Sequence, residues 1–271
     1  MTMPRKTLIQ YLGYMLAGLF ILCIPIFLIT SNLRWAVNDI RLYEYGFNKY
    51  AVSEETGFSD EELLEVAQGL IHYINTGQQG SEFEIFNDRE IVHLEDVRGL
   101  VLVNYRLQEA ALGFLLIFTI VGVIWQRKRF ASFLAKMLVR GSIFTIALLA
   151  VLGVVALVNF RWLFNAFHQL FFSGDSWILA GYLPRIFTEG FFSDAALFVI
   201  GAIVIETLII GGLGGYFVIR NRRAGSYPPV PQVAQLGAEQ LPQVSPAIEV
   251  DSPPVPLDKA EKDENSFLAE A

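Results

Sequence analysis

Cysteine, histidine and charge are all scarce in this chain. Its 271 residues include one cysteine, Cys23, and three histidines, which excludes a disulfide framework and argues against a cysteine-based or histidine-rich metal site. Charged residues make up 17% of the chain, whereas soluble domains carry about 25%. The net charge is −7, with 20 basic and 27 acidic residues, so the chain lacks the basic surface that nucleic-acid binding requires. We therefore expect no metal, no cofactor and no nucleic-acid partner.

The apolar residues, 54% of the chain, are gathered into long runs. The run at residues 8–30 carries no charge and is long enough to cross a hydrocarbon core of about 30 Å. A secretory signal peptide is the competing explanation, because Arg5 and Lys6 precede this run. A signal core is shorter, about 7–15 residues, and a small-residue cleavage site should follow it, which the sequence after Thr30 does not offer. Three further runs, at 108–125, 139–158 and 195–219, complete four predicted transmembrane helices.

Basic residues beside the runs predict their orientation. The flanks at the N-terminus, between the second and third runs, and after the fourth run together hold ten basic residues and no acid. The segments after the first and third runs are mainly acidic. Because cytoplasmic loops of membrane proteins are enriched in Lys and Arg, we predict that both termini are cytoplasmic and that these two acidic segments face outward.

The expected fold is an α-helical integral membrane protein with four transmembrane helices and a small, mostly helical (α+β) extracytoplasmic domain. Eight prolines between Pro228 and Pro256 predict a disordered cytoplasmic tail, and nothing in the sequence names its partner. The predicted parts are the start with helix 1 (1–30), the extracytoplasmic domain (31–107), helix 2 (108–125), a basic loop (126–138), helix 3 (139–158), an aromatic outer loop (159–194), helix 4 (195–219) and the tail (220–271).

The first outer segment contains two helix starts. Ser59 and Glu62 have the spacing of a capping box, and Asn87 followed by Glu90 marks a second N-terminus. Between them, residues 82–86 alternate polar and apolar, which predicts a short strand.

Two histidines in the outer segments are the candidate site residues. Glu90, His93 and Asp96 are spaced three apart, so they share a helix face, although on this spacing alone a structural surface histidine is the better explanation of His93. His168 lies in an aromatic stretch of the second outer segment. The interfacial aromatic belt explains the rings there but not His168 or the charged residues near it, which are Asp175, Arg185 and Glu189.

At these residues the chain resembles a family of small bacterial four-span membrane proteins that includes the lipoprotein intramolecular transacylase, Lit. The resemblance covers about residues 8–220 and leaves out the tail. It is carried by the order of Tyr50, Thr56-Gly57, Ser59 and Leu63, by the passage from Phe86 to Arg98, and by Phe167-His168 with the residues that follow to Asp194. The sequence departs from the family pattern at residues 184–186 and in its long proline-rich tail.

The resemblance implies a reaction in which an acyl chain moves from the S-diacylglyceryl group of a lipoprotein to the α-amino group of its N-terminal cysteine. It places His93 and His168 at the reaction centre. Histidine titrates near neutral pH and can serve as general base or acid. We assign His93 as the base and His168 as the group that protonates the leaving oxygen or polarises the carbonyl, with the reverse assignment left open. Supporting roles are expected for Glu90, Asp96, Asp175, Arg185 and Glu189.

Other functions remain open at this point. A non-enzymatic membrane protein, such as an assembly factor or sensor, could use the outer domain and the tail as interaction surfaces. A transporter is disfavoured, because four spans are few and no pair of broken helices stands out. In either remaining case the location is the bacterial plasma membrane, with membrane lipids and, for the enzyme, lipid-modified proteins as partners.

Overall fold

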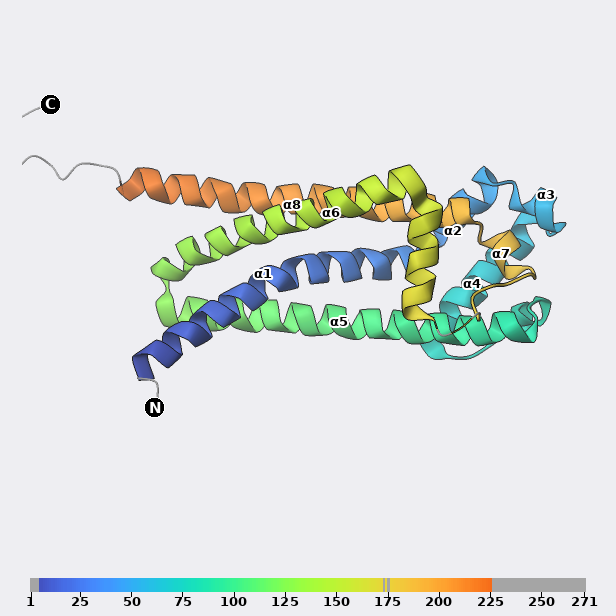
Figure 1. Cartoon of the computed structure of the whole chain (residues 1–271), viewed down its shortest axis with the longest axis horizontal. Coiled ribbons are helices and arrows are strands. Elements are labelled where there is room, and N and C mark those ends of the chain that lie inside the picture. The colour runs from blue at the N-terminus through green and yellow to red at the C-terminus, as the bar shows by residue number, and fades with distance from the viewer. Residues whose placement is uncertain (1–4, 173, 175, 226–271) are drawn as a thin grey trace, which may run out of the picture. The chain divides into compact units, whose positions relative to one another are not determined.

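The structure, a computed structural model, describes residues 5–172, 174 and 176–225. Four long helices form its bundle: α1 (Arg5–Asn38), α5 (Asp88–Gln126), α6 (Lys128–Phe171) and α8 (Glu189–Gly225). Each contains a stretch that is long and apolar enough to cross a membrane, so the chain is a multi-pass membrane protein. In the bundle α6 packs mainly against α8, and α1 packs mainly against α5 (Figure 1).

Small residues allow the close approach of α6 and α8. A Cβ at Gly211 would lie 2.9 Å from the Cβ of Ser142, and one at Gly214 would lie 3.0 Å from the carbonyl oxygen of Ala135. Small residues at helix contacts are typical of membrane bundles. Lipid tails are as apolar as the helix surfaces, so the helices associate through close van der Waals packing rather than through the hydrophobic effect. The glycines of the fourth run therefore serve helix packing.

The domain at one end of the bundle is built from short helices (Figure 1). These are α2 (Ile40–Lys49), α3 (Val52–Thr56), α4 (Asp60–Thr76), a 3₁₀ helix η1 (Ser81–Ile85) and α7 (Leu183–Ile186). The predicted capping boxes are both present: Ser59 with Glu62 begins α4, and Asn87 with Glu90 begins α5. Helix α4 then buries one apolar face, which includes Leu63, Ala67, Leu70 and Ile74.

The predicted strand at residues 82–86 is wrong, and with it the α+β description of this domain. The segment forms the 3₁₀ helix η1, and the described residues contain no β-sheet. The physical reason is the spacing of Phe83 and Phe86. Residues three apart lie on the same side of a 3₁₀ helix, and both rings are buried, with Phe83 4.9 Å from the ring of Tyr73. A strand would direct these two rings to opposite faces.

The helices extend beyond the predicted spans. Helix α5 has 39 residues, about 58 Å at 1.5 Å per residue, so it passes from the membrane-spanning bundle into the domain of short helices as one element. The predicted basic loop at 126–138 is reduced to a turn at Arg127, because α6 begins at Lys128 and Phe130 packs against Gly122. Helix α8 continues to Gly225, and the rest of the predicted tail lies outside the described residues.

Candidate functional site

The start of α5 positions His93. The Asn87 side chain accepts hydrogen bonds from the backbone N–H groups of Arg89 and Glu90, which fixes the first turn of the helix. His93 follows one turn after Glu90 and its side chain is buried, with 7% exposed. The histidine therefore sits on a rigid helix rather than on a loop.

A bend in α6 positions His168. The backbone leaves helical geometry at Asn159 (φ −154°, ψ 74°), and the Asn159 side chain accepts a hydrogen bond from the Trp162 N–H at 3.0 Å. Asn159 thus caps a second helical stretch, residues 160–171, which we call the arm. Figure 1 shows the arm running across the end of the bundle, transverse to the long helices. His168 lies near its far end.

The arm brings His168 onto His93. The two imidazole rings are nearly parallel, with centroids 6.1 Å apart and an interplanar angle of 20°. The ring of Phe172 contacts both, at 4.9 Å from His93 and 5.3 Å from His168. Two histidines from separate helices, α5 and α6, therefore form one histidine pair.

Aromatic rings surround His168. Its ring centroid lies 4.1 Å from that of Phe164, 5.1 Å from that of Trp177 and 5.6 Å from that of Phe167. Such surroundings restrict ring rotation, so the two imidazoles are held in a defined relation.

Hydrogen bonding distinguishes the two imidazoles. Nδ1 of His168 is 2.7 Å from the carbonyl oxygen of Phe164, and because a carbonyl only accepts, Nδ1 carries the proton. In the neutral ring Nε2 then holds the free lone pair. Nδ1 of His93 is buried and has no hydrogen-bond partner among the described residues. A proton on His93 is therefore better placed on Nε2, where a substrate can accept it.

The closeness of the rings couples their protonation. Two imidazolium ions at 6.1 Å would repel each other, so the pair accepts one proton more readily than two. The carboxylate of Asp96 also interacts electrostatically with His93, although Asp96 itself is exposed. The pair is suited to passing a single proton.

We expected Glu90 to support the histidine pair, but its hydrogen bonds go to Asn87 and Leu183. Its side chain is fully buried and does not bond His93. Oε1 accepts a hydrogen bond from the Leu183 N–H at 2.6 Å, and Oε2 accepts bonds from Asn87 N at 3.0 Å and Nδ2 at 2.9 Å. A Cβ at Gly181 would collide with this carboxylate. Glu90 thus joins the start of α5 to the segment that follows Trp177.

The other expected supporting residues lie around the site rather than in it. Glu189, at the start of α8, accepts from Arg161 Nε at 3.1 Å and holds the base of the arm. Arg185 donates to the backbone oxygen of Glu55 and so joins α7 to α3. Asp175 lies outside the described residues.

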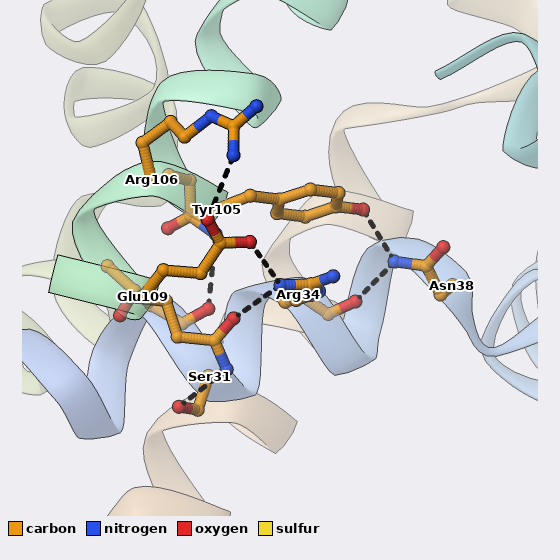
Figure 2. A network of polar contacts seen from close by, with 9 residues as sticks. Ser31, Arg34, Asn38, Tyr105, Arg106 and Glu109 are labelled. Carbon is orange, nitrogen blue, oxygen red and sulfur yellow. Dashed lines mark hydrogen bonds and ion pairs between the residues drawn. The ribbon is translucent and has the colours of Figure 1, made fainter. Parts of the chain in front are cut away.

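A polar network joins α1 to α5 (Figure 2). The guanidinium of Arg34 lies 4.2 Å from the ring centre of Tyr105 and 3.6 Å from the carboxylate of Glu109, which also accepts from Arg106 at 3.0 Å. Asn38 Nδ2 donates to the Tyr105 hydroxyl at 2.6 Å. These contacts fix α5 against α1 where both helices leave their apolar runs.

Sequence reasoning missed several residues of the site. Phe164, His168 and Phe172 are spaced four apart, and this spacing, which places side chains on one helix face, could have revealed the aromatic contacts. No local signal could have placed Trp177 or the Leu183 N–H, because Trp177 lies in an irregular segment and Leu183 begins the one-turn helix α7 that follows it.

Comparison with known proteins identifies the same group of proteins as the sequence motifs. The profile of the family described as "Lipoprotein intramolecular transacylase Lit" matches residues 18–192. An uncharacterized protein of Aquifex aeolicus is 26% identical over 211 residues, which cover 71% of this chain and 93% of the relative.

Solved structures of Lit from Bacillus cereus share the fold. One matches with a TM-score of 0.70 at 20% identity, covering 79% of this chain and 99% of the other. A variant of the same protein with a histidine-to-alanine substitution matches with a TM-score of 0.67 at 18% identity, covering 81% of this chain and 100% of the other. By the family match over residues 18–192, this chain belongs to the lipoprotein intramolecular transacylase (Lit) family of membrane acyltransferases.

Proposed function

We propose that this chain transfers an acyl chain from the S-diacylglyceryl group of a lipoprotein to the α-amino group of its N-terminal cysteine, using His93 and His168. The observation that carries the proposal is the histidine pair itself, with ring centroids 6.1 Å apart. Family membership supports the reaction, and the geometry supports the residues.

The reaction needs one proton to be taken up and returned. The α-amino nitrogen attacks the ester carbonyl carbon, a C–N bond forms, and the C–O bond to glycerol breaks. The amine loses a proton and the departing glycerol oxygen gains one. A base and a hydrogen-bond donor close to the same carbonyl are sufficient for this chemistry.

The hydrogen bonds favour His168 as the base, which reverses the assignment that the sequence favoured. Because Nδ1 of His168 is bonded to Phe164, its Nε2 accepts the amine proton and then delivers it to the glycerol oxygen. His93 donates from Nε2 to the carbonyl oxygen as negative charge develops there.

The surroundings of the pair favour direct transfer over an acyl-enzyme intermediate. The rings in contact with the two histidines are Phe164, Phe167, Phe172 and Trp177, and none of them is a nucleophile. Cys23, the single cysteine of the chain, is buried in α1. The substrate's own amine therefore serves as the nucleophile.

The test is mass spectrometry of the lipoprotein N-terminal peptide from a strain lacking the wild-type gene. With the wild-type chain we expect the N-acyl, monoacylglyceryl form. His93→Ala and His168→Ala should each lower the rate by about 10²–10⁴-fold, as removal of a general acid or base does. His72→Ala is the matched control, because His72 is exposed on α4.

Two results would contradict the proposal. If both histidine variants keep full activity, the assigned site is wrong. If the wild-type chain converts no lipoprotein, the non-enzymatic alternative replaces the acyltransferase.

A further inference from the structure

The arm turns an apolar face away from the rest of the protein. Trp162, Phe167, Leu170 and Phe171 are 59%, 42%, 75% and 52% exposed. On a helix of 3.6 residues per turn these four positions lie within one half of the surface. The opposite side holds Phe164 and His168, which pack toward His93.

An exposed face of this kind is not stable in water. Large aromatic and aliphatic side chains in a contiguous exposed patch mark a surface that contacts a partner or a membrane. Gln169 is the exposed polar residue among them, which is too little to solvate the face. Some apolar material therefore covers the arm.

The position of the arm indicates what covers it. The preceding part of α6 exposes a row of apolar residues along the membrane-spanning bundle, and this row leads into the bend: Val151, Val154, Leu157 and Val158. The arm then crosses the bundle end transverse to the spans (Figure 1). Since the spans cross the bilayer, an element transverse to them lies along its plane.

The connections at both ends keep the arm in this position. At its base, Arg161 is paired with Glu189 at the start of α8. At its far end, His168 and Phe172 pack on His93 of α5. The arm therefore spans the end of the bundle from α8 to α5 and cannot swing freely into water.

We propose that the arm is an interfacial helix whose outward face lies among lipid acyl chains, in the leaflet next to the α2–α4 domain. Amphipathic helices bind at this depth by burying their apolar face at the boundary between head groups and acyl chains. The consequence rests on the proposed function: the histidine pair then sits at the boundary, and a lipid-anchored substrate reaches it from the leaflet.

The test measures where the arm lies, independently of activity. In a Cys23→Ala background, Leu170→Cys carries a nitroxide label in vesicles of phosphatidylethanolamine and phosphatidylglycerol. Electron paramagnetic resonance power saturation then compares label access to oxygen, which concentrates in acyl chains, and to a water-soluble nickel chelate. Val154→Cys, on the exposed face of α6, is the lipid reference, and Glu61→Cys, on α4, is the water reference.

We expect the Leu170 label to resemble the Val154 label, with high oxygen and low nickel access. A label that resembles Glu61 would overturn the proposal by placing the arm in water. Low access to both reagents would also overturn it, since another protein surface would then cover the arm. A label at Trp162→Cys provides a second position. Because no readout here depends on acyl transfer, failure of the interfacial arm is distinguishable from failure of the enzymatic function.

Discussion

Replacing Glu90 by glutamine should release the segment that carries Trp177. The Glu90 carboxylate is fully buried and accepts three hydrogen bonds, one from Leu183 N and two from Asn87. Glutamine has the same shape but offers one oxygen and one NH₂ group. Whichever way the amide is turned, its NH₂ group faces a donor.

The size of the destabilisation follows from the amide orientation that loses fewer hydrogen bonds. With the amide oxygen directed at Asn87, two of the three bonds survive, and the Leu183 N–H is left facing NH₂ at the 2.6 Å contact. A hydrogen bond to a charged group contributes about 1.5–3 kcal/mol. The free energy that holds Leu183 on α5 should fall by about this amount, which raises the population of the locally open state by roughly 10- to 150-fold.

Hydrogen–deuterium exchange of the peptide that contains Leu183 is the assay. The Glu90→Gln chain should exchange this amide faster by the factor above, while amides in the middle of α6 should be unchanged. Glu95→Gln is the matched control, because Glu95 is exposed on the same helix. Unchanged exchange at Leu183 would refute the inference that Glu90 docks this segment, and equal acceleration by Glu95→Gln would show a non-specific charge effect.

Two further predictions concern the membrane bundle. Asn32 Nδ2 donates to Glu206 Oε2 at 2.8 Å. Asn32→Leu should therefore destabilise the protein by about 1–3 kcal/mol, because it leaves the half-buried Glu206 carboxylate without this donor, whereas Glu206→Gln keeps an oxygen for the bond. Thermal unfolding in detergent compares the two variants, and equal midpoints would contradict the pairing. A topology reporter fused after Ala271 or inserted at Arg127 should be cytoplasmic, and one inserted near Gln79 should be outside, because the basic flanks lie on the same side as the first two positions. An external signal at Arg127 would contradict the four-span orientation.

Local sequence signals predicted the helices well. The capping boxes at Ser59 and Asn87 depend on residues three apart, so the sequence contains them directly. The four apolar runs likewise predicted the four long helices. The predicted strand failed because polar–apolar alternation over five residues also fits a 3₁₀ helix, in which Phe83 packs on Tyr73 and Phe86, just after the helix, packs on Phe83.

The site could be predicted only in part. The sequence identified His93 and His168 as candidates, and the structure brings their rings together. The contact of Glu90 with Leu183 joins residues 93 positions apart, and no periodicity reports such a pair. The bend at Asn159 depends on the backbone angles of one residue, which composition does not reveal, yet it determines where the arm and His168 lie.

The most direct test of the account is the rate of acyl transfer by the His93→Ala/His168→Ala double variant, compared with each single variant in reconstituted vesicles. If the two imidazoles act as one unit on one proton, removing the second should cost little once the first is gone, because effects of residues that act together are not additive. We predict a double-variant rate within about threefold of the slower single variant. If the rate loss of the double variant equals the product of the two single-variant losses, the two histidines act independently, and this result would contradict a shared site.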